Sequence, residues 1–226
     1  MKQVNIYVEG KGDMLFLAHF ITNHFGVEFE IDAAAITARS SSQSLQIIIT
    51  AFDGDSKEGG IDQKKISGLI EEILNVNAPL GIQSVIFIDA DTPAHKHPQG
   101  GFTDRNAYLE KFQATVDFSF FIIPNHSDNG NLEDLLDTII ATNGKPFYEC
   151  LSRYVTCLEN ISGPFIPKYV EESKCMKKEK ILWYTYMMLG KKTSKSEQQN
   201  YLQADLWDLT SVSLNPLKLF LAKIVE

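Results

Sequence analysis

The sequence predicts an α/β protein with a mostly parallel sheet flanked by helices and a helical C-terminal extension. Up to residue 141, short apolar runs typical of strands alternate with segments whose apolar residues recur at the helical period. From residue 145 onward only helical patterns follow. We therefore predict an α/β domain over residues 1–141 and a helical extension over residues 142–226 that packs on it. A chain of 226 residues is long enough to bury one large core.

The sequence of residues 4–26 predicts a strand, a tight turn and a helix. The strand is expected at residues 4–8, and Glu9 follows it on the turn. The helix is expected at residues 14–25, with Asp13 as its N-cap and Gly26 at its end. The glycine spacing of the turn matches neither GxGxxG nor GxxxxGK[ST], so a role in the turn is favoured over a phosphate-binding loop.

Two more strands and a helix come before the next buried strand. Residues 28–38 and 45–52 are expected to be strands joined by a polar loop, and the pattern leaves open whether they pair as a hairpin. The helix begins at Asp62 or Gln63 and continues to Leu74, because its apolar residues recur with the helical period.

The strand expected at residues 85–88 is the central element of the predicted fold, because two candidate site residues follow it. Its four consecutive apolar residues predict burial on both faces, and Asp89 and Asp91 follow at its carboxyl end. In extended chain the side chains of residues i and i+2 point the same way, about 7 Å apart. Two carboxylates in one space repel each other and raise each other's pKa unless a cation lies between them. We therefore predict a site for Mg²⁺ or Mn²⁺ at this sheet edge, where open α/β folds bind their ligands.

A loop, a short helix and another buried strand come next. His95 and His97 form an HxH pair, but further zinc ligands at motif spacing are missing, so a solvated loop is favoured. The helix is expected at residues 104–113 and the strand at residues 118–123.

Glu133 and Asp134 lie in the first turn of a helix expected at residues 132–142. Acidic residues in a first turn are usually explained by the helix macrodipole. These two also follow a buried strand directly, at the sheet edge where Asp89 is expected. A role as ligands of a second metal ion is therefore equally open.

Lys177, Lys178, Lys191 and Lys192 flank the aromatic residues of a helix expected at residues 175–189. Basic residues interleaved with aromatics can bind a phosphate backbone and stack bases, so these lysines are candidates for contacts with DNA or RNA. At helical spacing, aromatic side chains belong more often to the core, and the lysines would then form a solvated face. Further helices are expected at residues 147–158 and 216–225.

The net charge of −8 is distributed unevenly. Residues 1–141 hold 9 Lys and Arg against 20 Asp and Glu, a charge of −11, whereas residues 142–226 hold 12 against 9, a charge of +3. An acidic half that carries the site and a basic half behind it suit a metal enzyme acting on a polyanion. Two differently solvated faces explain the same charges equally well.

Three cysteines occur, Cys150, Cys157 and Cys175, and none forms a CxxC pair. A sparse, odd set is typical of a reducing compartment. The sequence has no apolar run of 18 residues, and its N-terminus lacks the features of a signal peptide. We therefore expect a cytoplasmic protein without a membrane partner.

Three motifs at strand ends follow one another along the chain. They are Glu9-Gly10, then Asp89-x-Asp91, then Pro124-Asn125 followed by Gly130-Asn131-Leu132-Glu133-Asp134. Their order resembles the Toprim domain of topoisomerases, primases and OLD-family nucleases over about residues 1–141. The chain is more closely similar to an uncharacterised stand-alone Toprim-like family. This resemblance implies a Toprim-like (Rossmann-like) sheet.

The resemblance also implies site residues and an activity. Asp89 and Asp91 are expected to hold Mg²⁺ (or Mn²⁺), and Glu9 to serve in metal binding or proton transfer. Topoisomerases also need a tyrosine nucleophile on a separate module, and primases a template-binding module. Neither is recognisable in the sequence, so nuclease-type phosphodiester hydrolysis of DNA or RNA is the nearest activity. Lys11 could contact a substrate phosphate, with an exposed turn lysine as the alternative.

Other readings of the same residues stay open. OLD-family nucleases carry an ATPase domain and this sequence has no P-loop, so an ATPase partner in trans is conceivable. The run from Asp89 to Thr92 also matches the DxDxT motif of haloacid-dehalogenase-type phosphatases, although those enzymes carry it on their first strand. Sugar-nucleotide glycosyltransferases use a strand-end DxD as well, without further support here. A metal-binding, catalytically inactive interaction module is the alternative from a different class.

Overall fold

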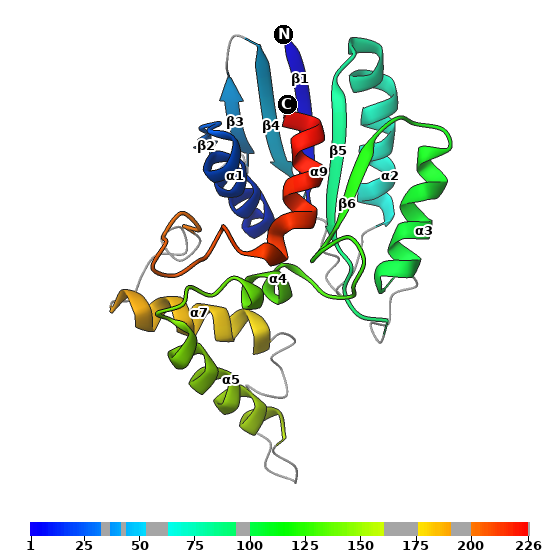
Figure 1. Ribbon diagram of the computed structural model, residues 1–226. Coiled ribbons are helices and arrows are strands. Elements are labelled where there is room, and N and C mark those ends of the chain that lie inside the picture. The colour runs from blue at the N-terminus through cyan, green and yellow to red at the C-terminus, as the bar shows by residue number, and fades with distance from the viewer. Residues whose placement is uncertain are drawn as a thin grey trace.

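A six-stranded sheet in the order β2-β3-β4-β1-β5-β6 forms the centre of the fold (Figure 1). The computed structural model describes residues 1–32, 37–41, 44–52, 63–93, 100–160, 176–190 and 200–225. The strands are β1 (Lys2–Val8), β2 (Glu30–Asp32), β3 (Thr37–Ser41), β4 (Leu45–Ala51), β5 (Gln83–Asp89) and β6 (Ser119–Ile123). β1 pairs in parallel with β4 and β5, and β5 in parallel with β6. The predicted mostly parallel α/β sheet is therefore confirmed.

The other two strands extend the sheet in the antiparallel sense. β3 pairs with β2 on one side and with β4 on the other. The question that the sequence left open is thus answered, because β3 and β4 form a hairpin. The single strand expected at residues 28–38 is wrong, since β2 and β3 divide that segment and residues 33–36 lie outside the described part.

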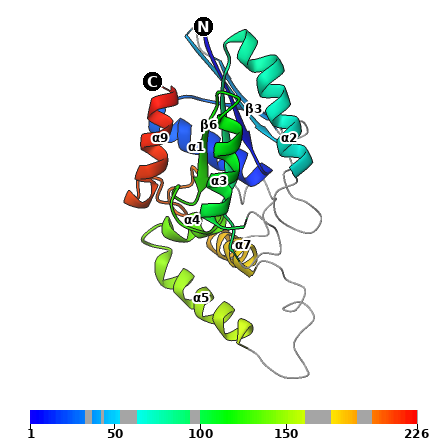
Figure 2. The same cartoon turned by 90° about the vertical axis from the view of Figure 1, so that its right-hand side faces the viewer.

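Helices cover both faces of the sheet (Figure 2). The helices are α1 (Lys11–Phe25), α2 (Gln63–Glu72), α3 (Phe102–Gln113), α4 (Leu132–Thr138), α5 (Lys145–Glu159), α7 (Met176–Leu189) and α9 (Asn215–Val225). Alternate residues of the strands point to opposite faces. Val85 and Phe87 of β5 join a core with α1, α4 and α9, whereas Ile86 and Ile88 join a core with α2 and α3.

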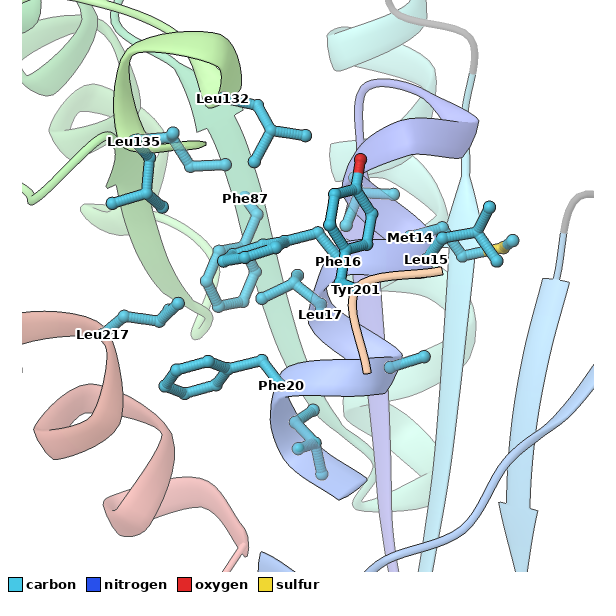
Figure 3. Close-up of a cluster of buried hydrophobic side chains, with 14 of the residues drawn as sticks. Met14, Leu15, Phe16, Leu17, Phe20, Phe87, Leu132, Leu135, Tyr201 and Leu217 are labelled. Atoms are coloured by element: carbon cyan, nitrogen blue, oxygen red, sulfur yellow. The ribbon is translucent and has the colours of Figure 1, made fainter. Parts of the chain in front are cut away.

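Figure 3 shows the core beneath α1. Phe16 and Phe20 of α1 share this cluster with Phe87 of β5 and Leu217 of α9, and all four side chains are buried. The C-terminal helix α9 therefore returns to the sheet and shares its core, although it follows the boundary predicted at residue 141. The division into two domains stays a prediction.

Several helix boundaries differ from those expected. α1 begins at Lys11 with Gly10 as its N-cap, so the prediction of Asp13 as N-cap is wrong. α3 begins at Phe102 after Gly101, two residues before the expected Asp104. α2 continues directly as a π-helix (Ile73–Asn77), beyond the expected end at Leu74. α4 ends at Thr138, before the expected end at residue 142.

α5 and α7 pack against each other beyond the carboxyl ends of the central strands, and α7 also contacts α4 (Figure 1). Among the described residues, no helix has the length and apolar character to cross a membrane.

Gly144, just before α5, packs directly on the ring of the buried Tyr184. A Cβ there would lie 2.9 Å from Tyr184 Cζ and closer still to Oη. Because this ring is fully enclosed, we expect Gly144→Ala to lower the free energy of unfolding by about 1–3 kcal/mol. Urea denaturation measures this change in the free energy of unfolding. The matched control is Gly68→Ala in α2, whose Cβ meets no atom within 4 Å and should raise stability by up to about 1 kcal/mol. Equal effects of the two substitutions would contradict close packing at Gly144.

Candidate carboxylate site at the edge of the sheet

Glu9 and Asp89 lie at the carboxyl ends of two neighbouring strands. β1 and β5 are parallel, with Val8 level with Phe87, so the residues that follow both strands meet at one edge. Glu9 and Asp89 therefore lie at the same edge of the sheet. Both side chains are half-buried.

The start of α4 meets Asp89. The backbone N–H of Leu132 donates to Asp89 Oδ1 over 3.0 Å. This contact arises because β6 pairs with β5 up to Asp89, and the loop after β6 then leads directly into α4. It brings the next residue, Glu133, toward the same edge.

Asp91 lies in a different environment from Asp89. Its φ of 58° is left-handed, and its backbone exchanges two hydrogen bonds with Gly130, of 2.7 and 3.0 Å. The chain has therefore left the strand after Asp89, and the prediction of two carboxylates pointing the same way from extended chain is wrong. Among the carboxylates that raise the pKa of Asp89, Asp91 has the weakest effect.

Arg105 of α3 is a buried cation at this edge. Its side chain is 1% exposed, forms an ion pair with Asp91, and has Nη1 3.6 Å from Oε1 of Glu9. Its Nε and Nη1 have no hydrogen-bond partner among the residues that the structure describes. Sequence reasoning missed Arg105. The available signal was its position four residues before the buried Leu109, on the inward face of α3.

Asp13 is the second residue that sequence reasoning missed as part of the site. It is the third residue of α1, and its Oδ2 accepts the backbone N–H of Gly10 over 2.9 Å. Burial, reinforced by the charge on Glu133, raises the pKa of Asp13 to about 7. The sequence pattern indicates only a helix cap at Asp13, because acidic residues are common in the first turn of a helix.

The carboxyl groups of the site disfavour one another's ionisation. Burial raises the pKa of Asp89 well above its usual range, and the charges on Asp13, Glu9 and Glu133 raise it further. Burial also raises the pKa of Glu133, against the opposing effect of Lys178. For Glu133, burial therefore outweighs the opposing charges of Lys178 and Lys177.

Glu133 and Asp134 have different partners. Asp134 closes a capping box with Asn131 at the start of α4 and forms an ion pair with Lys177. Its carboxylate is thus engaged in a helix cap. Glu133 interacts electrostatically with Asp13 and Asp89, and its Oε1 lies 3.9 Å from Nζ of Lys178.

The remaining predicted site residues lie around this edge or outside the described residues. Lys11 is the first residue of α1 and is partly exposed. Lys191 and Lys192 lie outside the described residues, as do His95 and His97.

Residues 3–226 match the family described as protein of unknown function (DUF3226). The chain belongs to the DUF3226 family. This DUF3226 protein is similar to a solved hypothetical protein of Pyrococcus horikoshii OT3, at 11% identity and a TM-score of 0.46, over 99% of this chain and 95% of that one. It is also similar to a futalosine hydrolase mutant of Helicobacter pylori, at 9% identity and a TM-score of 0.25, over 54% of this chain and 66% of that one. No curated protein matches it.

The donors of the site fit Mg²⁺ or Mn²⁺ in their chemistry, because all of them are carboxylate oxygens. The carboxylate oxygens do not form a complete coordination shell for a metal ion. Within the described part of the chain, no three His, Cys, Asp or Glu side chains are grouped so as to hold a metal ion. Glu9 and Asp91 face Arg105 instead. Metal binding at this edge therefore requires side chains to turn away from the guanidinium.

The raised pKa values predict how stability depends on pH. A carboxyl group with a raised pKa in the folded state stabilises the fold fully below its unfolded pKa, near 4, and this contribution is lost as the pH rises through the folded pKa. For Asp13 that window extends from about 4 to about 7. In EDTA, we expect the free energy of unfolding of the DUF3226 protein to fall across this window and Asp13→Asn to reduce that fall.

Urea denaturation at half-unit pH intervals measures this dependence, and Asp117→Asn is the control, because Asp117 is exposed and precedes β6, at the end of the strands opposite to Asp89. An Asp13→Asn profile parallel to that of the wild type would contradict the raised pKa.

Proposed function

We propose that this DUF3226 protein is a divalent-metal-dependent phosphodiester hydrolase that acts on DNA or RNA. The observation that carries the proposal is the crowding of carboxyl groups around Asp89 at the carboxyl edge of a parallel sheet. Burial and neighbouring charges raise the pKa of Asp89, Asp13 and Glu133. A bound cation offsets this repulsion, and open α/β sheets bind their ligands at this edge.

Asp89 would hold Mg²⁺ or Mn²⁺ together with Glu9 and Asp91, as the Toprim resemblance implies, and Asp13 is a further candidate. Mg²⁺ usually keeps several waters, so two or three carboxylates suffice. When bound, the ion would polarise the phosphate and neutralise developing charge. Glu133 and Asp134 remain candidates for a second ion, although the cap and the Lys177 pair engage Asp134.

Three residues of the site would have roles beyond metal binding. Glu9 is 12% exposed, so its carboxylate can reach solvent and exchange a proton with a water molecule or a leaving group. Arg105, through its contacts with Glu9 and Asp91, is a positioning residue that holds both carboxylates at the sheet edge. Lys11, at the start of α1, is the candidate for a phosphate contact.

The lysines beside the acidic edge support a polyanionic substrate. The side chains of Lys177 and Lys178 are 45% and 62% exposed and pair with Asp134 and Glu133. A phosphate backbone at this edge would compete for both lysines, and affinity would fall steeply with salt. The proposal extends to Lys191 and Lys192 from the sequence alone. An ATPase partner in trans rests on the resemblance alone.

The test is a cleavage screen of single- and double-stranded DNA and RNA with Mg²⁺ or Mn²⁺. We expect cleavage by the wild type, a loss of about 10²–10⁴-fold in Glu9→Gln, where proton transfer is removed, and no detectable cleavage by Asp89→Asn. Asp117→Asn, an exposed acid just before β6 and so at the opposite end of the strands, should cleave like the wild type. p-Nitrophenyl phosphate is included as a probe of the phosphatase alternative.

The other outcomes of the screen distinguish a contaminant, the phosphatase and the interaction module. Equal cleavage by the wild type and both site variants would identify a contaminant. Hydrolysis of the monoester alone would favour the DxDxT phosphatase. An inactive wild type that still binds the metal would favour the interaction module.

A further inference from the structure

A cavity of about 290 Å³ opens beside the carboxylate site, between α4, α7 and the start of α1. Leu132 and Leu136 of α4 line it on one side, and Ile181 and Leu182 of α7 on another. Its volume lies just below the roughly 300–1,000 Å³ of ligand pockets. The cavity therefore suits one ring system and not a long chain.

Tyr201 contributes to the wall of the cavity, and the charges on Asp13 and Glu133 act on its hydroxyl. Its ring is 4% exposed and packs edge-on against Phe16, with ring centroids 5.4 Å apart, so it is held in place. Figure 3 shows its hydroxyl pointing toward the start of α1 and Leu132. Burial and the charges on Asp13 and Glu133 raise the pKa of Tyr201, so its hydroxyl keeps its proton.

Glu133 connects the cavity to the carboxylate site. It lines the cavity, and its charge also acts on Asp13 and Asp89. Gly12, three residues after Glu9, lines the same cavity, and Lys178 lines it with its Nζ 3.9 Å from Glu133 Oε1. A ligand with a phosphate at the sheet edge therefore has a mainly apolar cavity within reach, which Glu179 and Thr185 also line, with the Glu133 carboxylate where cavity and site meet.

We propose that this cavity holds the base of the nucleotide whose phosphate lies at the carboxylate site, and that Glu133 selects guanine. The proposal rests on the proposed function. Among the four bases, guanine presents two adjacent donors, N1–H and N2–H, that match the two oxygens of a carboxylate, whereas other bases present an acceptor beside their donor. In this assignment Glu133 binds the base and not a second metal ion.

The test measures binding of GMP, AMP, CMP and UMP by titration calorimetry in the presence of Mg²⁺. We expect GMP to bind at least about tenfold more tightly than the others, which corresponds to 1.4 kcal/mol. Leu182→Trp fills the cavity from a partly exposed position and should weaken GMP binding at least about tenfold. Leu219→Trp, at an exposed leucine of α9, is the matched control and should bind GMP like the wild type.

Glu133→Gln is the second variant, because it is isosteric and does not fill the cavity. It should bring the affinity for GMP down to that for AMP. Equal GMP affinity in the wild type, Leu182→Trp and Glu133→Gln overturns the proposal, as does a wild type that cleaves nucleic acid but binds all four nucleotides alike. A wild type that prefers GMP and neither cleaves nor binds Mn²⁺ overturns the proposed function and leaves the cavity as a nucleotide site.

Discussion

Replacing Arg105 by methionine is expected to lower the free energy of unfolding by about 3–5 kcal/mol, the usual cost of removing one partner of a buried ion pair. The guanidinium is 1% exposed, pairs with Asp91 and faces Glu9. Without it, both carboxylates stay at an edge where Asp89 already has a raised pKa. Urea denaturation at pH 7.5 in EDTA measures the change.

The matched control for this substitution is Arg153→Met on the exposed face of α5, which should change stability by no more than about 0.5 kcal/mol. The double variant Arg105→Met, Asp91→Asn should recover part of the loss, because it removes one of the stranded charges. If Arg105→Met were as stable as Arg153→Met, the guanidinium would not be the counter-charge of the site.

Replacing Asp89 by asparagine is expected to stabilise the metal-free protein by about 0.5–2 kcal/mol, the range usual for substitutions that relieve an unfavourable native feature. Asparagine keeps the shape of the side chain, and its oxygen can still accept the N–H of Leu132. It removes the carboxylate whose ionisation is disfavoured by burial and by Asp13, Glu9 and Glu133. Thermal unfolding in EDTA at pH 8 measures the effect.

Asp117→Asn serves again as the control and should leave the melting temperature unchanged. A lower melting temperature for Asp89→Asn would show that the carboxylate contributes favourably to the fold without any cation. The crowding of negative charge around Asp89 would then not be unfavourable.

The sequence was sufficient to predict the central strands and the meeting of Glu9 and Asp89. β5 is an apolar run that only a doubly covered strand accommodates, and parallel strands bring their carboxyl ends to one edge. The helical pattern of α9 was also readable. The packing of α9 against the sheet could not be predicted, because an apolar helix face does not specify which surface covers it.

Arg105 and Asp13 could not be assigned to the site from the sequence, because their contacts depend on how α3 and α1 pack against the sheet. The backbone conformation of Asp91 could not be predicted from the sequence either. Its left-handed backbone is held by Gly130, a residue 39 positions later in the chain, and local periodicity carries no information about such a pairing. The DxD spacing therefore predicted the wrong geometry for Asp89 and Asp91.

The most direct test of a metal site around Asp89 is a calorimetric titration of the metal-free wild type with Mn²⁺, beside Asp89→Asn and Asp117→Asn. We expect the wild type and Asp117→Asn to bind the ion alike and Asp89→Asn not to bind it. Unchanged Mn²⁺ binding by Asp89→Asn, or no binding by the wild type, would contradict a metal site at this edge of the sheet.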